Sequence, residues 1–128
     1  IRRGAKFIAT NTDTALPVEG GEVWPGAGSI VAAVQACSGV EPTVIGKPSA
    51  WIGKAALDLL DLPPERVLCV GDRLETDILL GARTGMQTAL LLTGISTQNE
   101  AEEYSHPPTF IYQDLWGLMG ALGVKRDA

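Results

Sequence analysis

The stretch VLCVGDRLETD (residues 67–77) decides the fold of this chain. Its first four residues form a short apolar run, which is typical of a buried parallel strand. Gly71 allows a tight turn, so Asp72 is expected just beyond the carboxyl end of the strand, and a helix is expected from Ile78. Ligands bind at this end of the strands in open α/β sheets. The stretch therefore predicts a parallel sheet with a site at its rim.

Asp72, Thr76 and Asp77 give this turn its chemistry. Two carboxylates near a hydroxyl suit a hard cation and a phosphate better than they suit a hydrophobic core. The alternative is purely structural, because Thr76 or Asp77 could simply cap the following helix. A short motif gains meaning from its context, and the preceding strand favours the functional interpretation.

Working outward, strands and helices alternate from Thr43 to the end of the chain. A short strand at 43–45 leads into GKPS (46–49), and a helix follows and ends before Pro63. Lys47 is thus expected at a second strand-to-helix junction, on the same rim as Asp72 if the strands are parallel; the alternative is a solvated surface lysine. Further strands are expected at 87–92 and 109–112. This alternation predicts a parallel sheet with right-handed crossovers.

The first 43 residues have a different loop chemistry. A strand is expected at 6–10, a loop at 14–21, and a helix through residues 30–37 that ends at Gly39. Asn11 and Asp13 are turn formers by chemistry. This part is expected to belong to another layer or domain, with the boundary at about residue 43.

Composition limits the classes of partner. The chain has 15 acidic and 10 basic residues and a net charge of −5, which disfavours nucleic acid. No apolar run approaches the ~20 residues needed to cross a membrane, and no signal-peptide pattern is present. Cys37 and Cys69 lie in apolar segments and are expected as buried core residues without a disulfide, which fits the cytoplasm.

Together these motifs carry a resemblance to a known family. GKPS (46–49), followed after one helix by GDRLETD (71–77), resembles the third and fourth motifs of the haloacid dehalogenase (HAD) superfamily. ATNTD (9–13), PGAG (25–28) and LTG (92–94) resemble its NagD-like, 4-nitrophenylphosphatase-type subfamily, whose members hydrolyse phosphate monoesters and carry a large α/β cap. The resemblance implies an α/β chain. Residues 44–128 would be part of a HAD-like, Rossmann-like three-layer core with a parallel sheet, and residues 1–43 the end of the cap.

The resemblance also implies roles for four residues. Asp72 matches the carboxylate that holds Mg²⁺, and Asp77 matches the acidic partner that supports the metal site and the nearby lysine. Lys47 matches the lysine that contacts the transferred phosphate. Leu16 occupies the position in the cap loop that shapes substrate choice. The implied cofactor is Mg²⁺, and the implied substrate is a small phosphate ester.

The chain departs from the family in one important respect. It contains no Asp-x-Asp, the motif that supplies the nucleophile, so no catalytic nucleophile is assigned here. One hypothesis is a Mg²⁺-dependent phosphatase that forms an aspartyl-phosphate intermediate, with its nucleophile in a missing upstream half and this chain inactive alone. The other is a non-catalytic, truncated α/β module that packs against another chain. In either case the incomplete sheet predicts a homo-oligomer or completion by the missing part.

Overall fold

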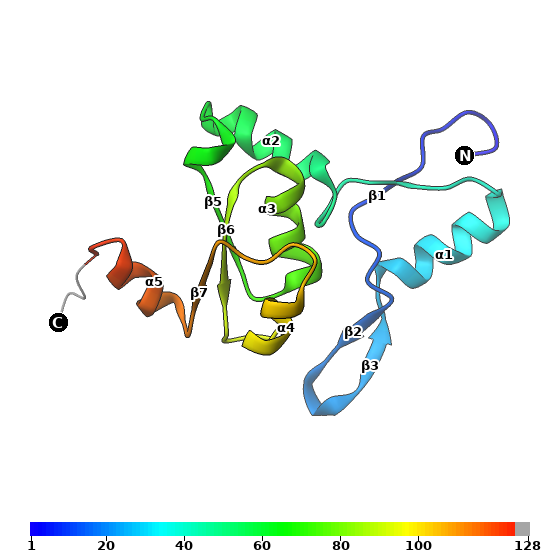
Figure 1. Cartoon of the computed structure of the whole chain (residues 1–128). Coiled ribbons are helices and arrows are strands. Elements are labelled where there is room, and N and C mark those ends of the chain that lie inside the picture. The colour runs from blue at the N-terminus through cyan, green and yellow to red at the C-terminus, as the bar shows by residue number, and fades with distance from the viewer. Residues whose placement is uncertain (125–128) are drawn as a thin grey trace. The chain divides into compact units, whose positions relative to one another are not determined.

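The computed structural model describes residues 1–124. Its internal contacts divide the chain into two compact units, Ile1–Ile52 and Gly53–Ala128, called here the N-terminal and C-terminal units and described separately (Figure 1). Within the described residues, no helix has both the length and the apolar character needed to cross a membrane.

The N-terminal unit contains two small sheets, one complete α-helix and the start of a second. β1 (Ile8–Ala9) pairs in parallel with β4 (Thr43–Val44). β2 (Ala15–Pro17) and β3 (Val23–Pro25) form an antiparallel hairpin around the 3₁₀ turn η1 (Glu19–Gly21). α1 (Ala27–Ser38) ends, as predicted, at Gly39, which has a left-handed φ of 70°.

The hairpin corrects the sequence-based expectation of a loop at 14–21. Gly20 and Gly21 have φ values of 87° and 80°, a conformation that glycine adopts without steric strain. The glycine pair that suggested a loop therefore reverses the chain, so that β2 and β3 can pair on either side of it.

The C-terminal unit is built on a parallel sheet, which confirms the alternating pattern. β5 (Leu68–Gly71), β6 (Gln87–Leu91) and β7 (Phe110–Tyr112) lie in that order. The π-helical turn η3 (Leu74–Ile78) and α3 (Leu79–Thr84) connect β5 to β6, and α4 (Gln98–Glu103) lies between β6 and β7. The remaining elements are the 3₁₀ turn η2 (Pro64–Arg66), α5 (Leu115–Ala121) and α2 (Ala50–Leu60), which begins in the N-terminal unit and continues into this one.

The core of the C-terminal unit lies directly behind the turn that follows β5. Leu74 and Ile78 of η3 pack with Leu90 of β6 and Ala101 of α4, and all four are almost fully buried. Burial of a large aliphatic side chain contributes about 2 kcal/mol, so the two core residues from η3 anchor this turn firmly. The turn that carries Asp72 therefore leads directly into a segment that is anchored in the core of this unit.

The burial of the two cysteines differs from the sequence-based expectation. Neither cysteine forms a disulfide within the described residues, but Cys37 is exposed and Cys69 only partly buried, so the expectation that both are core residues is wrong. The reason is that α1 is apolar on several sides and buries only Gly28, so its apolar spacing does not identify a core face.

The predicted boundary between cap and core at residue 43 stays a prediction. In the structure, β4 pairs with β1 inside the N-terminal unit.

Candidate active site

The turn after β5 presents Asp72 at the carboxyl end of the strand. Asp72 is partly buried, and the backbone then enters η3, where the amides of Asp77 and Ile78 both donate to the carbonyl of Arg73, at 3.0 and 3.3 Å. Such π-helical turns are rare and occur frequently at functional sites. The position of Asp72 at the strand end agrees with the sequence-based prediction.

The loop after β6 closes on the same turn. A β-carbon on Gly94 would overlap the carboxyl group of Asp72, so a larger residue at position 94 would force this carboxyl group to move. Beyond it, the backbone amide of Ser96 donates to the carbonyl of Asp72 at 3.3 Å, and the amide of Leu74 donates to Ser96 Oγ at 3.1 Å. Gly94 was part of the LTG motif, whereas sequence analysis missed Ser96. A usable signal was its location just past the end of the neighbouring strand.

Asp77 is buried and packs back against the end of β5. Its carboxyl group fills the space that a side chain at Gly71 would occupy, and the hydroxyl of Thr76 donates to Asp77 Oδ2 at 3.3 Å. The Cys69 thiol donates to the Asp77 carbonyl at 3.4 Å. Neither η3 nor α3 has a side-chain N-cap, so the interpretation of Thr76 or Asp77 as a helix cap is wrong.

The donor set fits Mg²⁺ only in part. Mg²⁺ is commonly held by one or two protein carboxylates, with waters and substrate phosphate completing the octahedron. Asp72 fits one such ligand, because its carboxyl group is oriented by the contact with Gly94 and remains partly exposed. Among residues 1–124, no cluster of three or more His, Cys, Asp or Glu side chains that could hold a metal ion is formed. The enclosed Asp77 fits a supporting position better than a direct ligand.

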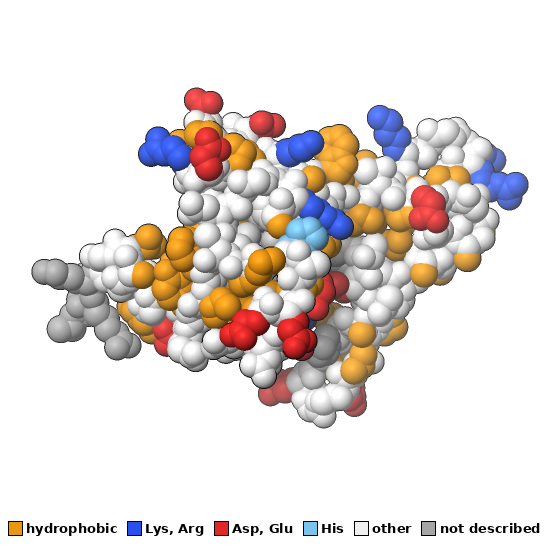
Figure 2. All heavy atoms as spheres, viewed as in Figure 1, with side chains coloured by type: hydrophobic (Ala, Val, Ile, Leu, Met, Phe, Trp, Pro, Cys, Tyr) orange, Lys and Arg blue, Asp and Glu red, His pale blue; other side chains and the backbone are white. Residues whose placement is uncertain are grey.

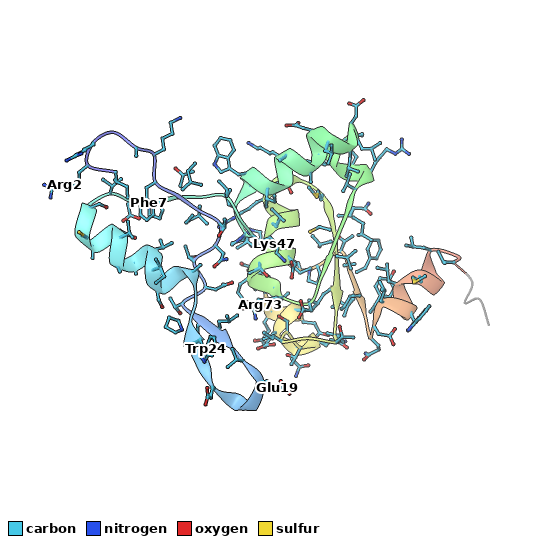
Figure 3. All side chains as sticks on the ribbon, turned by 180° about the vertical axis from the view of Figure 1, so that it is seen from behind. Arg2, Phe7, Glu19, Trp24, Lys47 and Arg73 are labelled. Atoms are coloured by element: carbon cyan, nitrogen blue, oxygen red, sulfur yellow. The ribbon has the colours of Figure 1, made fainter. Side chains whose placement is uncertain are left out.

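Lys47 belongs to the N-terminal unit. It is exposed and lies in the turn that follows β4, where the amide of Ser49 donates to the carbonyl of Gly46 at 2.9 Å (Figure 3). Its place directly after a strand agrees with the sequence. Asp72 belongs to the C-terminal unit, so a shared rim for Lys47 and Asp72 stays a prediction.

Leu16 lies on the hairpin, directly opposite Trp24. Opposite residues of an antiparallel pair share one face, and these two are 52% and 58% exposed, so they form an apolar pair open to solvent. Trp24 was missed because no hairpin was expected.

At the base of the hairpin, Asn11 Oδ1 accepts from the amide of Asp13 at 3.1 Å, and the Asp13 carbonyl accepts from the amide of Gly28 at 2.8 Å. Asn11 and Asp13 thus fix the loop, as expected.

Comparison with known proteins identifies close relatives. The sequence model of the HAD-hydrolase-like family matches residues 44–118. The acid sugar phosphatase of Staphylococcus saprophyticus is 44% identical over 115 residues, which cover 90% of this chain and 44% of that protein. The acid sugar phosphatase of Staphylococcus aureus (strain USA300) is 42% identical over the same coverage. The chain thus spans less than half the length of the curated relatives that it matches.

Solved structures agree with the sequence matches. The p-nitrophenyl phosphatase from Archaeoglobus fulgidus is 37% identical with a TM-score of 0.82, covering 93% of this chain and 47% of that one. The glycerol phosphate phosphatase from Mycobacterium tuberculosis, solved in complex with magnesium, is 38% identical with a TM-score of 0.81, covering 91% and 35%. The chain therefore has part of a HAD-like fold and belongs to the HAD-like hydrolases, in their NagD-like, 4-nitrophenylphosphatase-type branch.

Proposed function

We propose that this chain contributes the metal-binding and phosphate-binding part of a Mg²⁺-dependent phosphomonoesterase that acts on a small phosphate ester. The observation that carries the proposal is the placement of Asp72 at the carboxyl end of β5, with the loop of Gly94 closed against its carboxyl group. The relatives support the same class, since they are named as acid sugar, p-nitrophenyl and glycerol phosphate phosphatases.

In this proposal Asp72 is a direct ligand of Mg²⁺, and Asp77 supports the metal site from its enclosed position beside Gly71. Bound Mg²⁺ would neutralise the charge on the transferring phosphoryl group. Because Gly94 lies against the Asp72 carboxyl group and the Ser96 amide donates to the Asp72 backbone carbonyl, little reorganisation is needed when charge develops.

Lys47 and Leu16 have the remaining roles. The ammonium group of Lys47 contacts the phosphate before and during transfer, and Leu16 in the cap hairpin contributes to substrate choice.

The nucleophile of the aspartyl-phosphate pathway is an aspartate outside these 128 residues, since the chain contains no Asp-x-Asp. We accordingly expect the isolated chain to be inactive. Its two cysteines form no disulfide within the described residues, which is compatible with a cytoplasmic location.

Hydrolysis of 4-nitrophenyl phosphate tests the proposal, using the protein that contains these residues. We expect turnover that requires Mg²⁺, disappears with excess EDTA and returns when Mg²⁺ is restored. Turnover that persists in EDTA after exhaustive dialysis would reject the metal requirement. No turnover with any phosphate monoester would reject the phosphatase.

A second candidate is a non-catalytic module that packs against another chain or another copy. β5 is an edge strand within the described sheet, and edge strands can pair with other chains. Large apolar side chains are also exposed, and Figure 2 shows hydrophobic surface on both units; Trp51 and Leu59 are 64% and 87% exposed. This candidate predicts a stable oligomer without turnover, whereas the phosphatase predicts Mg²⁺-dependent turnover. Sedimentation velocity combined with the assay separates the two.

A further inference from the structure

Ser96 joins the loop after β6 to the turn after β5 through two hydrogen bonds. Its backbone amide donates to the carbonyl of Asp72 at 3.3 Å, and its hydroxyl oxygen accepts from the amide of Leu74 at 3.1 Å. Ser96 is itself buried, with 6% of the residue's surface exposed. One residue thus bonds to the backbone on both sides of Arg73.

The bond to Leu74 has a clear local reason. Leu74 begins the π-helical turn η3, where the first amides of a helical segment have no acceptor within it. No side chain of the turn itself caps it. Ser96 Oγ supplies the missing acceptor from a residue 22 positions further along the chain. Removal of this oxygen would leave a buried amide without a partner, which favours rearrangement of the turn.

We propose that Ser96 is a positioning residue for Asp72, holding the backbone at 72–74 so that the Asp72 carboxylate keeps the direction needed for Mg²⁺. Gly94 limits the carboxyl group from one side, and Ser96 fixes the backbone from which the side chain extends. The inference rests on the proposed function, because it requires Asp72 to be a metal ligand. Residues that orient metal ligands typically change metal affinity by 10- to 100-fold when they are replaced.

The test is Mg²⁺ binding, measured by isothermal titration calorimetry on the protein that contains these residues. Ser96→Ala is expected to weaken Mg²⁺ binding by about tenfold. Ser96→Thr and Ser96→Val form a matched pair of nearly equal shape, of which only the threonine keeps the hydroxyl. We expect Ser96→Thr to bind Mg²⁺ much more tightly than Ser96→Val, a comparison that remains valid if Ser96→Ala does not fold.

Thr97→Ala is the structural control. Thr97 caps α4 through its hydroxyl, which accepts from the amide of Glu100 at 3.4 Å, and has no bond to the Asp72 turn among those described. This variant should lower the melting temperature and leave Mg²⁺ affinity unchanged. A Ser96→Ala variant that loses stability like Thr97→Ala but binds Mg²⁺ like the wild type would overturn the positioning role. Equal affinities for Ser96→Thr and Ser96→Val would also overturn it.

Failure of the proposed function gives a different pattern. If the wild type binds no Mg²⁺ and Asp72→Asn changes nothing, the metal role of Asp72 is wrong, and the role of Ser96 fails with it. If the wild type binds Mg²⁺ and Asp72→Asn abolishes binding while Ser96→Ala has no effect, only the inference about Ser96 fails.

Discussion

Gly94 lies so close to Asp72 that a β-carbon at position 94 would overlap the carboxyl group of Asp72. The two residues are far apart in sequence and follow β5 and β6, which pair in parallel with Gly71 opposite Leu90. Gly94 is not among the glycines with positive φ, so the requirement is space and not backbone conformation. The contact is therefore a direct consequence of the sheet topology.

Gly94→Ala is expected to displace the Asp72 carboxylate and to weaken Mg²⁺ activation by about tenfold or more, as for other groups that orient metal ligands. The measurement is the Mg²⁺ concentration that gives half-maximal turnover. Gly120→Ala is the matched control, because a β-carbon there meets nothing within 4 Å. In helix α5 this control should raise stability by about 0.5–1 kcal/mol without changing turnover. Equal Mg²⁺ activation in the two variants would contradict the steric account.

Lys47→Ala is expected to raise KM and to lower kcat by about a hundredfold, because a fixed positive charge near the phosphoryl group is lost. Lys47→Arg should recover only part of the activity, since a planar guanidinium does not replace a compact ammonium. Steady-state kinetics with 4-nitrophenyl phosphate measure both. Lys54→Ala removes an exposed lysine of α2 and serves as the control. Full activity of Lys47→Ala would identify Lys47 as an ordinary surface lysine.

Leu16→Ala is expected to change substrate preference more than overall activity. A smaller apolar contact typically alters kcat/KM by tenfold or more for one substrate relative to another. We expect about a tenfold change in the ratio of kcat/KM for 4-nitrophenyl phosphate and glycerol phosphate. Val23→Ala is the control, since Val23 neighbours Trp24 on β3 and faces the opposite side of the hairpin. A ratio that responds equally in both variants would exclude a selective role for Leu16.

The stability of α4 should depend on pH through Glu100. The Glu100 carboxylate accepts from the Thr97 amide at 2.7 Å and from its hydroxyl at 2.8 Å, and these bonds lower the pKa of Glu100 from its ordinary value of 4.5. A lowered pKa in the folded state adds stability above pH 4.5, which is lost as the pH falls through the folded-state pKa. The difference in melting temperature between wild type and Glu100→Ala should therefore shrink below pH 4.5. A constant difference from pH 7 to pH 3 would contradict the assignment.

The junction at 67–77 could be predicted because its determinants are local. An apolar run, a glycine and an acidic turn follow one another, and each constrains the next few residues. The hairpin could not be predicted in the same way, because it depends on Leu16 pairing with Trp24 across a turn whose glycines also suit a loop. The burial of Cys37 was mispredicted, because a helix that is apolar on several sides does not show which of its faces is buried.

Ser96 shows why part of the candidate site escaped sequence analysis. A serine in a loop has no distinctive local pattern, and its bond to Leu74 arises only when two neighbouring strands bring their following loops together. Asp72 could be found because its motif lies within one turn, whereas Gly94 and Ser96 come from the loop after the neighbouring strand β6. Long-range contacts of this kind depend on the strand order.

The most direct test of the central claim compares Asp72→Asn with Asp58→Asn in the protein that contains these residues, by Mg²⁺-dependent hydrolysis of 4-nitrophenyl phosphate. Asp58 is an exposed carboxylate of α2 outside the site. Loss of a direct ligand should exceed the 10- to 100-fold effect of orienting groups, so Asp72→Asn should lower kcat by at least about a hundredfold. Asp58→Asn should behave as the wild type. Turnover by Asp72→Asn with unchanged rate and Mg²⁺ dependence would contradict the account.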